Sequence, residues 1–266
     1  MNEKNFEYLR DQLKYTGFGE ALEMELKEKL KQGEPSFTLY HETYTEDRVA
    51  RATLSFNKAK DTDMYFFNSY RLEMQKEDIT EALEHTFYIG KGANITMKEA
   101  QNLLQGRAVN KDLTSREGQP YNAWLQMDLK QGDDQGNFKL QHYHQNYGYD
   151  LEATLAQYPI KELGNQLYKE DLMRSLKKGN LQGATFLKEG QEIRYFIQAD
   201  PQFKTIIIYD ADQKKMDNKL CKDLNQIEVQ YEHVGEIKKK SQSENPKESQ
   251  EAKQTTRTRQ NRSHKL

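Results

Sequence analysis

The sequence predicts an α+β protein in which antiparallel β-sheets are covered by a few amphipathic helices. Apolar residues recur about every 3.6 positions near the N-terminus, and further along the chain the period changes to two, as in strands. Short polar loops between these strands favour antiparallel meanders. Only 35% of the 266 residues are of hydrophobic types, and 16 Tyr and 11 Phe supply much of the surface that can be buried. That composition suits sheets with one solvated face.

Residues 1–34 are expected to form a helical hairpin. Phe6, Leu9 and Leu13 have helical spacing, and the sequence TGFGE interrupts the run. The second stripe consists of Leu22, Leu26 and Leu30. It ends at Gly33 and Pro35, because glycine readily adopts the left-handed conformation of a helix C-cap and proline does not continue a helix.

Residues 35–106 are expected to form an antiparallel sheet and one capped helix. FTLYHETY, ARATLSF, DMYFFNSYRLEM and HTFYIGKG are typical of strands. The third is apolar on both sides near its start, so we expect a central strand covered on both faces. In NITMKEAQNLLQGR, Thr96 and Glu99 have capping-box spacing and Gly106 stands at the C-cap position, which predicts a helix over 97–105.

Residues 107–232 are expected to form a second α+β region. YNAWLQMDL alternates cleanly, which places Trp124 on the opposite face from Leu125. A short helix capped by Asp150, a helix over about 166–178 and a last group of strands follow. Whether the two β regions form one domain or two stays open.

Residues 233–266 are expected to be a disordered basic tail, because they have too few large apolar side chains to offset the entropy of ordering. From Glu236 to the end there are nine Lys/Arg and four Asp/Glu, a net of +5. Because the whole chain carries −2, the rest of the protein carries −7.

The start of the chain, MNEKNFEYLRDQLKYTG, lacks the apolar segment of a signal peptide, and no stretch approaches the length of a membrane-spanning helix. The single cysteine, Cys221, is compatible with a reducing compartment. We therefore expect a cytoplasmic protein without membrane association.

Two histidines, His142 and His144, stand two apart in FKLQHYHQNYGYDL and so share one face of a strand. A metal site needs further donors, and no other cluster supplies them by its spacing. We interpret both as ordinary strand residues, with a metal or catalytic role as the alternative. No Gly-x-Ser-x-Gly elbow or Walker A ending is present, and we expect no cofactor, metal site or catalytic constellation.

Five segments, MYFFNSY, NLLQGRAVNKDLTSREGQPYNAWLQMDL, YHQNYGYDLEATL, YPIKEL and ADPQFKT, together resemble a family of uncharacterised Bacteroidetes proteins. These proteins carry a domain of unknown function often found with mobile and conjugative elements. The resemblance extends from about residue 5 to residue 212, and it implies no established activity. Its centre corresponds to residues 105–111, 121–126 and 143–148.

The function that we expect is that of a non-enzymatic accessory or adaptor protein of a bacterial mobile element, which acts by binding a protein, a nucleic acid or both. The alternative is a DNA- or RNA-associated module that uses the basic cluster Arg107, Lys111 and Arg116 together with the tail. A third is an enzyme with an unrecognised site, which a pocket holding His144 and a carboxylate would favour.

The candidate binding residues are Arg107, Lys111, Arg116, Trp124, Tyr143 and His144. An exposed tryptophan on the polar face of a strand would favour a partner there. The alternative for Trp124 is burial under a helix in a sheet that is covered on both sides.

Overall fold

The computed structural model describes residues 1–45, 47–76, 82–90, 92–115, 117–134 and 136–217. Arg116 and the predicted tail, 233–266, lie outside the described residues. The helices are α1 (Glu3–Tyr15), α2 (Glu23–Gln32), α3 (Met97–Leu104), α4 (Leu151–Leu155) and α5 (Gln166–Lys177), with short 3-10 helices η1 (Gln145–Tyr147) and η2 (Lys161–Gly164). The strands are β1 (Ser36–Thr45), β2 (Arg48–Lys58), β3 (Tyr65–Lys76), β4 (Leu83–Tyr88), β5 (Val109–Thr114), β6 (Pro120–Gly132), β7 (Phe138–His144), β8 (Gln182–Lys188), β9 (Gln191–Asp200) and β10 (Thr205–Tyr209).

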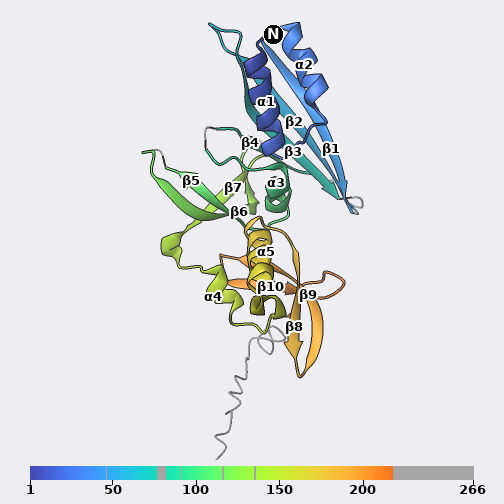
Figure 1. The fold of residues 1–266 in the computed structure, drawn as a ribbon, viewed down its shortest axis with the longest axis vertical. Coiled ribbons are helices and arrows are strands. Elements are labelled where there is room, and N and C mark those ends of the chain that lie inside the picture. Colours follow the sequence, from blue (N-terminus) through green and yellow to red (C-terminus); the bar gives the residue numbers. More distant parts are fainter. Residues whose placement is uncertain (46, 77–81, 91, 116, 135, 218–266) are drawn as a thin grey trace, which may run out of the picture. The chain divides into compact units, whose positions relative to one another are not determined.

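The strands of the described residues form three antiparallel sheets, in the orders β1-β2-β3-β4, β5-β6-β7 and β10-β9-β8 (Figure 1). Every pairing joins strands that follow one another in the sequence, because short turns bring each strand back beside the previous one. The α+β class expected from the sequence is confirmed.

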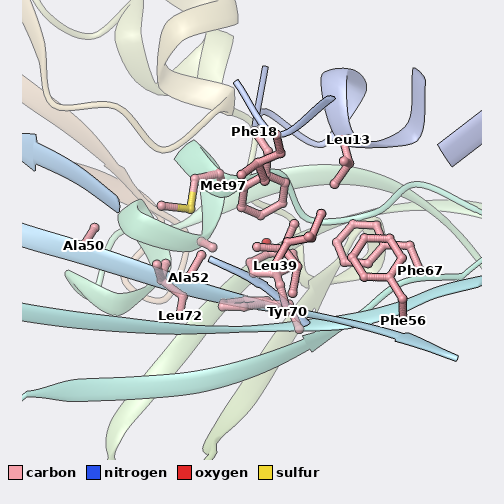
Figure 2. Close-up of a cluster of buried hydrophobic side chains, with 14 of the residues drawn as sticks. Leu13, Phe18, Leu39, Ala50, Ala52, Phe56, Phe67, Tyr70, Leu72 and Met97 are labelled. Atoms are coloured by element: carbon pink, nitrogen blue, oxygen red, sulfur yellow. The ribbon is translucent and has the colours of Figure 1, made fainter. Parts of the chain in front are cut away.

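The first sheet buries one face under α1, α2 and α3. Alternate residues of β1 and β2 point into this core, as the two-residue period predicts. Phe18, from the turn between α1 and α2, meets Tyr70 of β3 edge-on with ring centroids 5.1 Å apart (Figure 2). The helical hairpin is confirmed: both predicted stripes are buried, and Gly33 caps α2 with φ of 76°.

The third strand is central, but the prediction that both its faces are covered is wrong. Phe66 is 50% exposed, whereas Tyr65 and Phe67 are buried. Its register with β2 shifts between Ser55 and Phe56, so that Asn68 is an extra residue. Before this bulge the odd-numbered residues Tyr65 and Phe67 are buried, and after it the even-numbered residues are buried, beginning with Tyr70. Apolar residues in both phases therefore line a single core.

The predicted capping box of α3 is present. The Glu99 backbone amide donates to Thr96 Oγ1 at 3.4 Å, and the Thr96 amide donates to Glu99 Oε2 at 2.9 Å. The Tyr70 hydroxyl donates to the Ile95 carbonyl at 2.7 Å, which ties the start of the helix to β3. Leu103 and Leu104 are fully buried, as expected for a helix that packs on a sheet.

The sheet β5-β6-β7 contributes to two hydrophobic cores. Leu125 and Met127 of β6 belong to the first core, with α3 and the first sheet. Trp124, on the other face of β6, belongs to a second core with α4, α5 and β8–β10. The described residues all fall within one compact unit, residues 1–228.

The second core is closed by the two predicted helices. Asp150 caps α4 by accepting a hydrogen bond from the Ala153 amide at 3.1 Å. Helix α5 ends at Lys177, and Lys178 is its C-cap residue. The hairpin between β8 and β9 turns at Glu189 and Gly190, as predicted. No helix in the part of the chain that the structure describes is long and apolar enough to span a membrane.

Candidate functional site

Arg107 connects two helix ends instead of presenting its charge to solvent. Its Nε donates to the Gly179 carbonyl at 2.9 Å, and its two terminal nitrogens donate to Gln105 Oε1 at 2.8 Å and Asn102 Oδ1 at 2.6 Å. Burial lowers the pKa of Arg107 to about 10. Asn102 also donates to the Lys178 carbonyl at 2.6 Å. The surface position expected for Arg107 is therefore wrong: the residue joins the end of α3 to the end of α5.

Lys111 is likewise engaged inside the protein. Its Nζ lies 3.1 and 3.0 Å from the two carboxylate oxygens of Glu99, and the side chains are 13% and 9% exposed. The same carboxylate completes the capping box of α3. The expected basic cluster of Arg107, Lys111 and Arg116 is thus not found among the described residues, because two members have internal partners and Arg116 lies outside them.

Trp124 is buried, with 6% of its surface exposed. Its ring meets Tyr149 at 5.4 Å with an interplanar angle of 63°. The exposed docking role expected for Trp124 is wrong, and the alternative of a sheet covered on both sides is confirmed. The alternating pattern correctly places Trp124 and Leu125 on opposite faces of the strand. It does not reveal that a second hydrophobic core covers the face that carries Trp124.

His144 and His142 lie on one face of β7, as predicted, with ring centroids 6.1 Å apart. His144 is exposed and its ring contacts Tyr121 at 5.1 Å. Burial, and to a lesser degree the charge of His144, lowers the pKa of His142. Among the described residues no group of three or more His, Cys, Asp or Glu side chains could hold a metal ion.

Tyr143 lies on the opposite face of β7 and lines a polar pocket of about 590 Å³. We call this the amide–tyrosine pocket, and its polar lining comes from Gln126, Asp128, Gln141, Tyr143, Tyr147 and Gln202. Tyr143 packs on Tyr147 with centroids 4.9 Å apart, and the Tyr147 hydroxyl donates to the Gln202 carbonyl at 2.7 Å. Residues from three separate parts of the sequence, 106–130, 141–147 and 202, therefore meet around one cavity.

One buried polar atom of this pocket accepts no hydrogen bond from the described residues. Gln126 Nε2 donates to the Gly106 carbonyl at 2.9 Å, whereas its buried Oε1 accepts no hydrogen bond. Burial raises the pKa of Tyr143, and nearby Tyr147, Asp200 and Asp128 add to this shift. The Tyr143 hydroxyl is consequently a neutral donor that no other described residue binds. His144 is not part of this pocket.

A second candidate surface is the solvent-facing side of β1–β4, opposite the first core, which we call the open face. It carries four exposed aromatic residues, which are Tyr40 (66%), Tyr44 (71%), Phe66 (50%) and Tyr88 (74%). The pairing register places Tyr40, Thr53 and Arg71 in one row across three strands, and Glu42, Arg51 and Glu73 in the next. A hollow of about 530 Å³ lies over these two rows.

Charges on the open face are paired across strands. Arg51 Nε lies 2.8 Å from Glu42 Oε1, and its Nη1 lies 3.3 Å from Glu73 Oε1. Arg71 pairs with Glu84 of β4. Two arginines against three glutamates leave the face slightly acidic. Sequence reasoning missed this surface, although tyrosines in the polar phase of strands with one covered face were a signal for it.

No family model, curated protein or solved structure matches the chain. What it binds is therefore inferred from the chemistry of its own surfaces.

Proposed function

We propose that this protein is a non-enzymatic adaptor that binds a partner protein through the open face of its first sheet. The observation that carries the proposal is the set of four aromatic side chains, 50 to 74% exposed, on a face whose hollow is lined by Tyr40 and by paired arginines and glutamates. Tyrosine and arginine are the residue types that most often dominate protein–protein binding energy. Exposed aromatic groups gathered on one face typically mark an interaction site.

The charge of the open face favours a protein over a nucleic acid. Phosphate binding requires unpaired cations, and here Arg51 and Arg71 are both held by glutamates. A protein partner with mixed charges can instead exchange these exposed pairs at small cost, because each is worth about 0.2–1 kcal/mol in water. Tyr40 and Arg71 border the hollow, which can accept a side chain of the partner.

The biological setting in this proposal comes from the sequence. The resemblance to the Bacteroidetes family supports an accessory role in a mobile or conjugative element, and the single cysteine is compatible with a cytoplasmic location. The basic tail is a separate, salt-dependent means of attraction to nucleic acid.

The test compares two double variants in a pull-down from a nuclease-treated lysate of the source organism. Tyr40→Ser with Tyr88→Ser removes aromatic surface from the open face, and Tyr8→Ser with Tyr15→Ser removes equally exposed tyrosines from α1. We expect a protein captured by the wild type to be retained by the α1 variant and lost by the open-face variant. Equal capture by both variants, or capture by the wild type only from a parallel lysate that has not been treated with nuclease, would contradict the proposal.

A further inference from the structure

The amide–tyrosine pocket has features of a ligand site that the open face does not share. Its polar lining mixes amide groups, which both donate and accept, with tyrosine rings. Gln126 and Gln141 are cross-strand partners, so that their amides project side by side. Gln126 Oε1 is a buried acceptor that receives no hydrogen bond from the described residues, and the hydroxyl of Tyr143, which lines the cavity, is a potential donor to a ligand.

Aromatic surface is available beside these amides. Tyr147 is already engaged, since Tyr143 packs on it and Lys204 Nζ lies 4.8 Å from its ring centroid. Tyr143 is only half-buried and borders the cavity. Phe203, which follows the pocket residue Gln202, is 72% exposed. A planar ring can therefore stack on Tyr143, and a neighbouring ring on Phe203.

Cations surround the pocket. Lys130 lines it, Lys139 is the cross-strand partner of Asp128, and Lys204 lies over Tyr147. None of these ammonium groups forms an ion pair with another described residue. They outnumber the nearby carboxylates of Asp128 and Asp200. The pocket thus offers lysines without an ion-pair partner among the described residues, whereas both arginines of the open face are paired with glutamates.

From this arrangement we infer that the amide–tyrosine pocket binds a nucleotide unit. The base stacks on Tyr143, its polar edge meets the amides of Gln126 and Gln141, and its phosphate lies against the lysines. This inference does not depend on the proposed protein partner, because the residues belong to different sheets. The nucleotide can belong to a single-stranded nucleic acid or be free in solution.

The test uses the full chain with two probes, a fluorescently labelled 12-residue oligodeoxyadenylate followed by anisotropy, and adenosine monophosphate followed by the fluorescence of Trp124. Trp124 is the single tryptophan and the cross-strand neighbour of Tyr143. We expect Tyr143→Leu to weaken binding about tenfold, the loss expected when one stacked base is released. Because Tyr143→Leu also alters packing, its thermal unfolding is measured alongside.

A second variant leaves the core untouched. Lys130→Gln with Lys204→Gln is expected to weaken oligonucleotide binding and to lower the slope of log K against log salt by about one. The matched control, Lys31→Gln with Lys60→Gln, removes two exposed lysines elsewhere and is expected to leave the affinity unchanged within about twofold, since screened distant charges contribute little.

The two probes distinguish the sources of the ligand, and a chain ending at residue 235 removes the tail. Binding of either probe that depends on Tyr143 and the two lysines supports the inference. Saturable binding of the oligonucleotide alone assigns a nucleic acid, and equal binding of adenosine monophosphate assigns a free nucleotide. Binding that is lost with the tail but survives Tyr143→Leu overturns the inference, as does a wild type that binds neither probe in 50 mM salt.

Discussion

Replacing Lys111 by methionine tests whether this lysine serves the fold or a nucleic acid. The side chain of Glu99 is 9% exposed and that of Lys111 is 13% exposed, so the substitution leaves a carboxylate in a largely dry site. Removing one member of a buried pair typically costs about 3–5 kcal/mol. Glu99 keeps its bonds from the Thr96 amide at 2.9 Å and the Thr96 hydroxyl at 3.0 Å. We therefore expect the low end, a loss of about 3 kcal/mol in the free energy of unfolding.

A double variant isolates the charge. Glu99→Gln preserves an acceptor for the capping box, because glutamine serves at this position as glutamate does. Lys111→Met combined with Glu99→Gln contains no buried charge, and we expect it to recover to within about 1 kcal/mol of the wild type. Equilibrium unfolding in urea, followed by the fluorescence of buried Trp124, measures each midpoint at constant slope.

Two outcomes would refute this reasoning. A loss below about 0.5 kcal/mol in Lys111→Met would mean that the pair behaves as an exposed one. Unchanged stability together with weaker nucleic acid binding would mean that Lys111 contacts phosphate, as the sequence first suggested.

Two further predictions concern the glycine after α5 and the histidine of β4. Gly179→Ala is expected to cost about 3 kcal/mol, because φ is +77° and the new methyl would lie 2.9 Å from the Ala108 carbonyl oxygen. The control Gly33→Ala, with similar φ and open space, is expected to cost about 1 kcal/mol in the same urea titration. Equal losses of stability in Gly179→Ala and Gly33→Ala would mean that the close contacts around Gly179 do not contribute to the cost. Burial lowers the pKa of His85 from 6.5, and its Nδ1 accepts from the Phe138 amide at 3.0 Å. The unfolded chain therefore binds a proton first, so stability is complete above pH 6.5 and falls as the pH drops towards the lower folded pKa. The variant His85→Asn can still accept this hydrogen bond, and we expect its thermal midpoint to fall less between pH 6.5 and 5 than that of the wild type. An unchanged fall would mean that the pH dependence comes from His41 and His142, whose pKa values burial also lowers.

Local structure was largely predictable because its causes are local. The capping box at Thr96 and Glu99, the Asp150 cap and the turn at Glu189 and Gly190 depend on residues a few positions apart. The helical hairpin followed in the same way from the spacing of its leucines. Of the candidate site, the sequence located Tyr143 within a segment that does line a pocket. It did not identify Gln126, Gln141 or Gln202 as the neighbours of Tyr143.

The errors share one physical origin. A two-residue period shows which side chains share a face, but not what covers that face. Trp124 stands in the polar phase of β6 and is nevertheless buried, because α4, α5 and the last sheet supply a second core. The sequence predicted Arg107 to be a surface cation. In the folded protein it is buried and donates to the Gly179 carbonyl, which lies 72 positions later in the sequence.

The sequence alone was enough to predict the class of fold, the helix caps at Gly33, Thr96 and Asp150, the strand phases outside the bulge and the charge of the chain. The tertiary structure alone decided which faces are covered, where the bulge at Asn68 resets a strand, and that Gln126, Tyr143 and Gln202 border one cavity. Helix caps and turns depend on hydrogen bonds between residues a few positions apart, so a short stretch of sequence is enough to predict them. Coverage and pockets arise from contacts between segments far apart in the sequence, such as Asn102 with Lys178, 76 positions later, and exist only once the chain has packed.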